Sequence, residues 1–211
     1  MADETHPRAT GPSVWTRADM ERDNSWAFRF SKTDLAELER ATTALHDRGI
    51  PPLEFRKEDF PLPTLGPKLI DLLDDVEYGR GFVVLKGLNV TDYELDKLSV
   101  LYWGLGTHLG QIISQNSQGD LLGQVTDLED GKYEQGGYYE EGVREHRTNA
   151  FLAPHSDSSD VVGLLCMQPA KEGGESWVSS SIAVYNRILE TRTDLIGPLL
   201  QGFHYDLVGK G

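Results

Sequence analysis

The sequence predicts an α+β or mainly β fold, and three features of its apolar pattern bear on this assignment. Residues 33–48, 68–78 and 95–105 carry leucines at helical spacing. Two short apolar runs, at 81–87 and 161–167, are bounded by glycine or polar residues, which is typical of buried strands. Glycine- and proline-rich segments separate these stretches, as expected for the connections of a compact domain.

The chain begins with a polar stretch, residues 1–25, for which we expect a loose arm pinned in places by Trp15 and Trp26. The first helix follows this arm. Ser31 is placed to cap its start and Gly49 to end it, because serine favours the position before a helix and glycine the position after it.

Two further helices are predicted after a proline-rich connector. Five prolines between residues 51 and 67 favour a rigid, non-helical connection. The second helix covers 68–78. Before the third helix, Thr91 and Glu94 match a capping box. The glycines expected to stop this third helix are Gly104, Gly106 and Gly110.

The C-terminal half is predicted to alternate loops with strands and helices. Residues 119–148 are rich in Gly, Glu, Asp and Tyr and indicate a long loop, a lid or an insertion, with one short strand at 120–126. After the second apolar run, a glycine turn precedes a strand at 175–179. A serine cap then begins a helix over 182–189, and a further short helix fits 194–200.

The composition excludes several functions. The 211 residues carry a net charge of −14, from 34 acidic and 20 basic side chains, which argues against binding nucleic acid or an anionic membrane. Neither a secretory signal nor a membrane-spanning apolar run is present, so we expect a cytoplasmic protein. Cys166 is the only cysteine, which rules out an internal disulfide, and its apolar surroundings predict a buried thiol.

His155 and Asp157 are the residues most indicative of chemistry. In an extended segment, residues two positions apart project to the same side, so an imidazole nitrogen and a carboxylate oxygen can converge. With a second histidine they would form the two-His-one-carboxylate triad of non-haem Fe(II) oxygenases. Two alternatives stay open: a purely structural pair, and a zinc or manganese site with another His or Glu near His155.

The order of motifs around this pair resembles the taurine dioxygenase-like family. His155-Ser-Asp157 is followed by the apolar run, by a Pro-Ala-Lys-Glu-Gly-Gly-Glu-Ser-Trp segment ending at Trp177, and by Ser-Ile-Ala-Val-Tyr-Asn ending at Asn186. The resemblance implies a double-stranded β-helix, a jelly-roll fold, with N-terminal and inserted helices over residues 26–211. The family's late strands carry a distal His and an Arg, so we expect the fold to be incomplete at the C-terminus.

The resemblance also implies roles for individual residues. His155 and Asp157 match the first two iron ligands, and Ser176 matches the hydroxyl that contacts a carboxylate of 2-oxoglutarate. From the residues alone, Ser176 could equally be an outward-facing strand serine. His108 lies where the family often places substrate-facing residues, with an ordinary loop histidine as the alternative. His204 does not match the distal iron ligand.

The function implied by the resemblance is that of a dioxygenase dependent on Fe(II) and 2-oxoglutarate. Such an enzyme hydroxylates a small organic substrate with dioxygen and decarboxylates 2-oxoglutarate oxidatively to succinate. The protein supplies binding and orientation while the cofactor supplies the reactivity. The alternative is a catalytically inactive dioxygenase-like protein that lacks the distal His and Arg.

Overall fold

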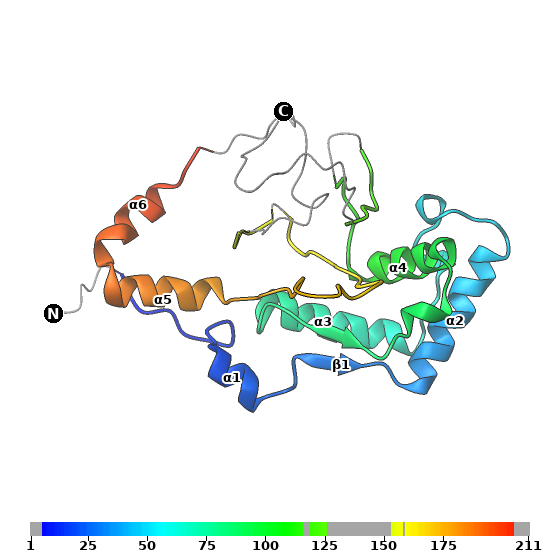
Figure 1. The fold of residues 1–211 in the computed structure, drawn as a ribbon, viewed down its shortest axis with the longest axis horizontal. Helices are drawn as coiled ribbons and strands as arrows, with labels where there is room; N and C mark the ends of the chain where they lie inside the picture. The colour runs from blue at the N-terminus through cyan, green and yellow to red at the C-terminus, as the bar shows by residue number, and fades with distance from the viewer. Residues whose placement is uncertain (1–5, 116–118, 126–152, 158, 205–211) are drawn as a thin grey trace. The chain divides into compact units, whose positions relative to one another are not determined.

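The computed structural model describes residues 6–115, 119–125, 153–157 and 159–204 (Figure 1). The chain divides into two units, a larger one formed by residues 1–112 with 163–211 and a smaller one formed by residues 113–162. All described helices and strands belong to the larger unit. Most of the predicted loop at 119–148 lies outside the described residues, and its part from 119 to 125 has no regular secondary structure.

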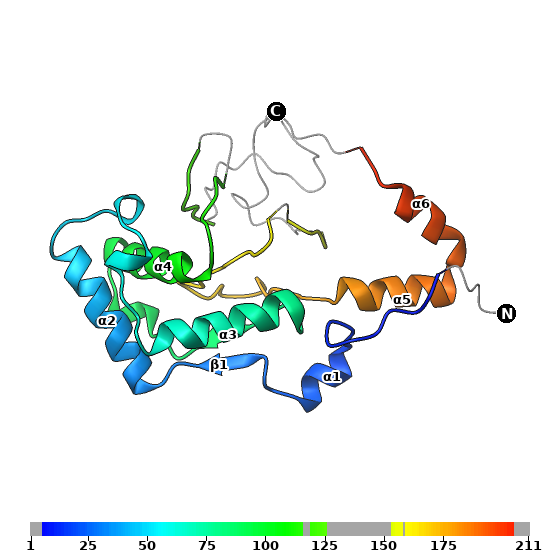
Figure 2. The same cartoon turned by 180° about the vertical axis from the view of Figure 1, so that it is seen from behind.

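Three helices form the packed part of the larger unit (Figures 1 and 2). Helix α2 (Lys32–His46) and helix α3 (Leu65–Tyr78) both pack against α4 (Leu95–Leu109). Each fully buried leucine side chain contributes about 2 kcal/mol of hydrophobic stabilisation. The apolar side chains buried most completely in these helices and their connector are Leu38, Leu45, Phe60, Leu65, Leu69 and Leu101. The helical part of the predicted α+β class is therefore confirmed.

Residues at their N-termini explain where helices α2 and α3 begin. Ser31 caps α2, as predicted, because its hydroxyl accepts a hydrogen bond from the backbone N–H of Asp34. Helix α3 begins three residues earlier than the predicted start at 68. Pro67 therefore falls in its first turn, where proline is tolerated since the backbone N–H has no helical partner there.

Helix α4 corrects two predictions. Its N-cap is Glu94 without a side-chain cap, and the Thr91 hydroxyl instead donates to Asn89 Oδ1 at 2.9 Å. The helix also continues through Gly104 to Leu109, and Gly110 follows as its C-cap. A Cβ added at Gly104 would lie 2.5 Å from ring atoms of Phe60. The glycine inside this helix thus serves close packing and does not stop the helix.

The sheet has two parallel strands. Strand β1 (Ala27–Arg29) pairs with β2 (Val84–Lys86), with Phe28 opposite Leu85. Strand β1 was not predicted, since three residues give too short a pattern. Strand β2 lies inside the predicted run 81–87, but it is not buried, because Val84 is 38 % exposed. Among the described strands β1 is its one partner, and its side chains stay partly accessible.

The connector between α2 and α3 contains two short turns, η1 (Pro52–Glu54) and η2 (Lys57–Asp59). The aromatic rings that follow them, Phe55 and Phe60, are buried and stacked at a centroid distance of 6.0 Å. The connector therefore contributes apolar side chains to the helical core.

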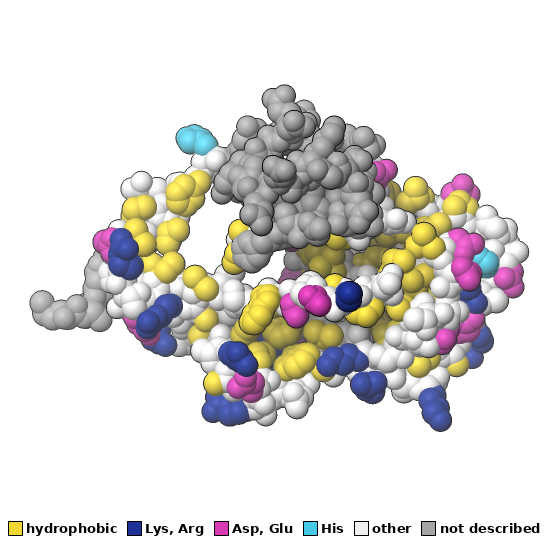
Figure 3. All heavy atoms as spheres, in the orientation of Figure 1, with side chains coloured by type: hydrophobic (Ala, Val, Ile, Leu, Met, Phe, Trp, Pro, Cys, Tyr) yellow, Lys and Arg dark blue, Asp and Glu magenta, His cyan; other side chains and the backbone are white. Residues whose placement is uncertain are grey.

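The C-terminal part of the larger unit contains the helices predicted there. Helix α5 (Ser181–Thr191) begins at the predicted serine, and the short η5 (Thr193–Leu195) and α6 (Ile196–Gln201) cover the last predicted helix. Hydrophobic side chains lie on the surface in this part of the chain (Figure 3). They include Ile182, Val184, Leu199, Leu200 and Phe203.

The strands predicted in this half do not form among the described residues. Residues 161–167 and 175–179 have no strand assignment, and Leu164 is 75 % exposed. Cys166 is exposed as well, so the expectation of a buried thiol is wrong. A strand needs a neighbour for its backbone hydrogen bonds, and no described segment pairs with these runs. The double-stranded β-helix is accordingly not among the described elements, which are mainly helical and not mainly β as predicted.

The described part of the N-terminal arm is attached to the larger unit. It contains helix α1 (Arg17–Arg22). The Trp15 indole N–H donates to the carbonyl of Arg80 at 2.8 Å, and that of Trp26 donates to the carbonyl of Met20 at 3.2 Å. The prediction that the two tryptophans pin the arm is confirmed. Among the helices that the structure describes, none combines the length and apolar content needed to cross a membrane.

Candidate metal centre and cosubstrate segment

His155 and Asp157 lie in the smaller unit, in a stretch without regular secondary structure, and both side chains are exposed. The two side chains approach each other, with 3.9 Å between His155 Nε2 and Asp157 Oδ1. The backbone therefore presents one nitrogen and one oxygen donor to a common space, as the spacing of two residues predicts.

The other ring nitrogen of His155, Nδ1, contacts the backbone and thereby indicates which nitrogen is free to bind a metal. His155 Nδ1 lies 2.9 Å from the carbonyl oxygen of Ala153. Because a carbonyl only accepts hydrogen bonds, Nδ1 is the donor in this contact, which leaves Nε2 as the nitrogen that can bind a metal. A backbone carbonyl in this position is the usual partner of a metal-binding histidine, since it orients the ring.

The two donors are close enough to be drawn onto one divalent ion. Donors on adjacent octahedral positions, each about 2.1 Å from the ion, lie about 3.0 Å apart, so His155 Nε2 and Asp157 Oδ1, 3.9 Å apart, would approach by about 1 Å on binding it. Within the described ranges no group of three His, Cys, Asp or Glu side chains is placed to hold a metal. As a metal site the pair would supply two ligands and leave the remaining coordination positions to other groups.

Ser176 belongs to the larger unit and follows a tight glycine turn. Gly173 and Gly174 have φ angles of 69° and 75°, in the left-handed region that favours glycine. A Cβ at Gly174 would lie 2.9 Å from the Cβ of Ala170, so this position is also sterically closed to larger residues. The predicted turn is confirmed, and the turn leads directly to an exposed Ser176.

His108 lies in the last turn of α4, inside the helical core. It is 7 % exposed, and its Nε2 is 2.8 Å from the carbonyl oxygen of Phe60. Its Nδ1 is buried without a hydrogen-bond partner among the described residues, close to the backbone of Gly66. These contacts support a packing role, and the alternative of a loop histidine is wrong. The predicted role near substrate stays a prediction.

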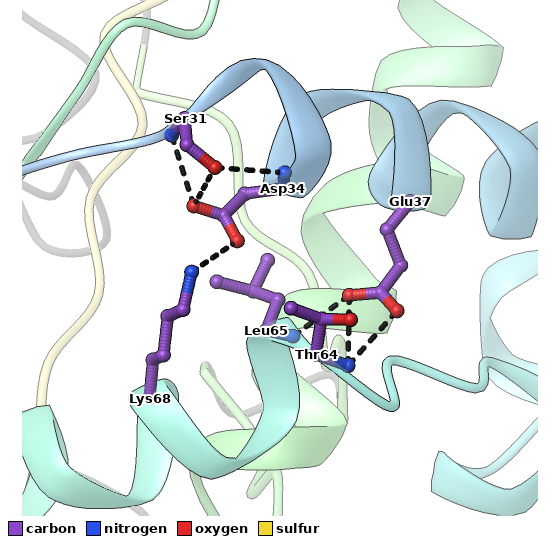
Figure 4. A network of polar contacts seen from close by, with 6 residues as sticks. All are labelled: Ser31, Asp34, Glu37, Thr64, Leu65 and Lys68. Atoms are coloured by element: carbon purple, nitrogen blue, oxygen red, sulfur yellow. Dashed lines mark hydrogen bonds and ion pairs between the residues drawn. The ribbon is translucent and has the colours of Figure 1, made fainter.

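The structure adds a polar network between α2 and α3 that the sequence analysis missed (Figure 4). Glu37 is buried, and its carboxylate accepts the backbone N–H groups of Thr64 at 3.0 Å and of Leu65 at 2.7 Å. It therefore caps the start of α3 from another helix, where a negative charge also suits the helix dipole. An acidic residue on the leucine-bearing face of a predicted helix was the signal available in the sequence.

Asp34, one turn earlier on α2, completes this network. Its carboxylate accepts hydrogen bonds from Lys68 Nζ at 2.7 Å and from the Ser31 hydroxyl at 2.7 Å. Burial alone raises the pKa of Asp34, but the hydrogen bonds from Lys68 and Ser31 outweigh it and hold the pKa below its usual value. The network links α2 to α3.

Comparison with known proteins identifies related chains. Residues 46–210, which include His108, His155, Asp157 and Ser176, match the family described as taurine catabolism dioxygenase TauD, TfdA family. The chain is 29 % identical over 201 residues to FR-33289 synthase of Streptomyces rubellomurinus, covering 95 % of this chain and 58 % of that protein. It is 30 % identical over 198 residues to a taurine hydroxylase-like protein of Stachybotrys chartarum, covering 92 % of this chain and 50 % of that protein.

The chain thus spans between half and three fifths of the length of these curated relatives. The family match covers the greater part of the chain, from the end of α2 to the C-terminal residues. On this ground the chain belongs to the TauD, TfdA family of taurine catabolism dioxygenases.

Proposed function

We propose that this chain provides an iron- and cosubstrate-binding part of an Fe(II)- and 2-oxoglutarate-dependent dioxygenase that hydroxylates a small organic substrate. The observation that carries the proposal is the pair formed by His155 Nε2 and Asp157 Oδ1, 3.9 Å apart. Membership of the TauD, TfdA family supports the reaction class. The names of two relatives, a synthase and a taurine hydroxylase-like protein, support a small-molecule substrate.

The residues of this chain have distinct roles in the proposal. His155 donates the lone pair of Nε2 to the metal, while the Ala153 carbonyl holds the ring in place. Asp157 supplies a carboxylate oxygen and a negative charge that partly neutralises the ion. When bound, Fe(II) with 2-oxoglutarate supplies the activation of dioxygen and the oxidation of the C–H bond.

Ser176 is the proposed contact to the cosubstrate. Its hydroxyl can donate a hydrogen bond to a carboxylate oxygen of 2-oxoglutarate, and a hydrogen bond to an ionised acceptor is stronger than one between neutral groups. The glycine turn before it leaves space beside the backbone at Gly173, where an added Cβ would meet nothing within 4 Å. Ser176 is exposed and therefore accessible to such a ligand.

The proposal extends to the scaffold, a double-stranded β-helix. The apolar runs at 161–167 and 175–179 have the composition of strands, yet their side chains are exposed and they pair with no described segment. Exposed apolar runs of this kind are expected where further strands complete a sheet. A closed scaffold of this type would also exclude water from the metal.

The test is anaerobic addition of Fe(II) and 2-oxoglutarate to the protein, followed by admission of dioxygen. We expect a weak visible charge-transfer band before oxygen and succinate after it. His155→Ala and Asp157→Ala should abolish both signals, and His204→Ala is the matched control that should leave them unchanged, since His204 is an exposed histidine outside the pair. Succinate formation that survives His155→Ala would contradict the proposal. Iron binding without succinate would favour the inactive dioxygenase-like alternative.

A further inference from the structure

Residues 7–13 of the N-terminal arm lie against helix α5, far away in the sequence (Figures 1 and 2). The contacts are polar and involve both backbone and side chains. They join the amide group of Asn186 with Ala9, the hydroxyl of Tyr185 with the carbonyl of Pro7, the side chain of Arg8 with Glu190, and the hydroxyl of Ser180 with the carbonyl of Ser13. We call this set of contacts the clasp.

Asn186 is the centre of the clasp. Its Oδ1 accepts the N–H of Ala9 at 2.8 Å, and its Nδ2 donates to the carbonyl of Ala9 at 2.9 Å. Asn186 is only 3 % exposed, whereas no other side chain of α5 is buried. A side-chain amide both donates and accepts, so it satisfies both backbone groups of one residue in the way that a neighbouring strand would. Both hydrogen-bonding groups of this buried amide are therefore used by the arm.

Ser180 connects the clasp to the start of α5. Its hydroxyl accepts the N–H of Ala183 at 2.9 Å as the N-cap of the helix, and it donates to the carbonyl of Ser13. Ser180 is buried, although every residue from 171 to 179 is exposed. Ser180 is therefore the anchored end of the exposed segment that carries Ser176, four residues away.

We propose that Asn186 and Ser180 are positioning residues, through which the N-terminal arm fixes the segment that presents Ser176 to 2-oxoglutarate. The inference rests on the proposed function, since Ser176 is the proposed cosubstrate contact. The physical basis is preorganisation: a hydroxyl on a segment with a fixed end loses less conformational entropy when it binds a carboxylate. Release of the arm then weakens cosubstrate binding without removing any group that contacts the ligand.

The experiment uses two variants that release the clasp from opposite sides. Asn186→Leu keeps a similar side-chain size but removes both hydrogen-bonding groups, while Ala9→Pro removes the donor on the arm and leaves α5 unchanged. Arg187→Ala is the matched control, because Arg187 is the next residue of α5, is exposed and pairs with Glu190 of the same helix at 3.8 Å. Hydrogen–deuterium exchange and anaerobic equilibrium dialysis of 2-oxoglutarate with Fe(II) are the two measurements.

Both releasing variants should raise amide exchange about tenfold in residues 7–13 and in residues 174–183, with no change in the helical core. They should weaken 2-oxoglutarate binding by about five- to tenfold, and Arg187→Ala should change neither quantity. Faster exchange confined to residues 7–13, with unchanged 2-oxoglutarate affinity, would overturn the inference. If the unaltered protein binds no 2-oxoglutarate, the proposed function fails, and exchange in residues 174–183 still decides whether the clasp fixes this segment.

Discussion

Two apolar regions of the larger unit differ sharply in how they bury their side chains. In the helical core formed by α2, α3 and α4, Leu101 is 0 % exposed. In the C-terminal segment, residues 163–203, Leu164 is 75 % and Trp177 is 85 % exposed. A helix satisfies its own backbone hydrogen bonds and needs only a neighbour for one face, whereas a strand needs partners for its backbone as well. The described chain supplies the helices with such neighbours and leaves the apolar runs of the C-terminal segment without them.

The sharpest test of this comparison truncates one leucine in each region. Leu101→Ala should lower the free energy of unfolding by about 3 kcal/mol, because it removes buried methyl groups and leaves a cavity. Leu164→Ala should change it by less than about 0.5 kcal/mol, since the side chain is already accessible. Urea unfolding followed by circular dichroism gives both values. A loss of several kcal/mol for Leu164→Ala would show that this segment is packed.

The next effect concerns the cap that Glu37 provides for α3. Glu37→Ala should destabilise the protein by about 2 kcal/mol, because the N–H groups of Thr64 and Leu65 lose their acceptor and that of Leu65 is buried. Glu37→Gln keeps one acceptor oxygen and should cost about half as much. Thermal unfolding of the two variants separates the cases, and equal losses for both would mean that the negative charge alone matters.

Glycine-to-alanine substitutions in the two regions should change the free energy of unfolding in opposite directions. At Gly104 the gain in helix propensity, about 1 kcal/mol, is exceeded by the clash with Phe60, so we expect a net loss of about 1 kcal/mol. At Gly197 in α6 an added Cβ meets nothing within 4 Å, so Gly197→Ala should stabilise by about 0.5 kcal/mol. The same sign for both variants, measured by urea unfolding, would contradict the packing described at Gly104.

The buried network makes the helical core sensitive to acid. The pKa of Asp34 is below its unfolded value of about 3.9, so its ionised form contributes stability above about pH 4, and this contribution is lost as the pH falls through the folded value. Lys68→Met removes the partner of Asp34 and should flatten the fall in stability below pH 5. Unfolding curves between pH 3 and pH 6 test this, with Lys57→Met at an exposed lysine as control. If the unfolding free energy of Lys68→Met falls with pH as steeply as that of the unaltered protein, this role of Asp34 is contradicted.

The smallest effect is expected at the surface pair of His46 and Asp96. The hydrogen bond to Asp96, 3.1 Å from His46 Nε2, raises the pKa of His46 above its ordinary value of about 6.5. Its contribution to stability is therefore present below pH 6.5 and is lost as the pH rises through the folded value. An NMR titration should show the raised pKa in the unaltered protein and a lower one in Asp96→Asn. Equal values in the two proteins would exclude this pairing.

The elements that the sequence predicted correctly are those that local chemistry determines. Ser31 and Ser180 cap α2 and α5, and leucine spacing placed α2 and α3 to within a few residues. Of the three glycines predicted to stop α4, Gly110 does end it, whereas Gly104 lies inside the helix because Phe60, more than forty positions away, packs against it. The exposure of the runs at 161–167 and 175–179 depends on which other segments lie beside them, which no local pattern reveals.

In the candidate site, too, some features follow from the local sequence and others depend on the rest of the chain. The spacing of His155 and Asp157 was sufficient to predict that their side chains share one side of the chain, and the structure places them 3.9 Å apart. Their assignment as metal ligands stays a prediction. The contact that fixes the His155 tautomer, from Ala153, depends on the local backbone path, and the clasp around Asn186 depends on a residue at the other end of the chain. Neither has a sequence pattern of its own.

The claim on which the proposed function depends is that His155 and Asp157 bind the same ferrous ion. Anaerobic calorimetric titration with Fe(II) on the protein, His155→Ala, Asp157→Ala and the double variant tests it most directly. If both side chains hold one ion, each single substitution weakens binding by at least about 100-fold, and the double substitution costs much less than the product of the two. An unchanged Fe(II) affinity in either single variant would contradict a shared ion. So would a double variant whose loss of affinity equals the product of the two single losses.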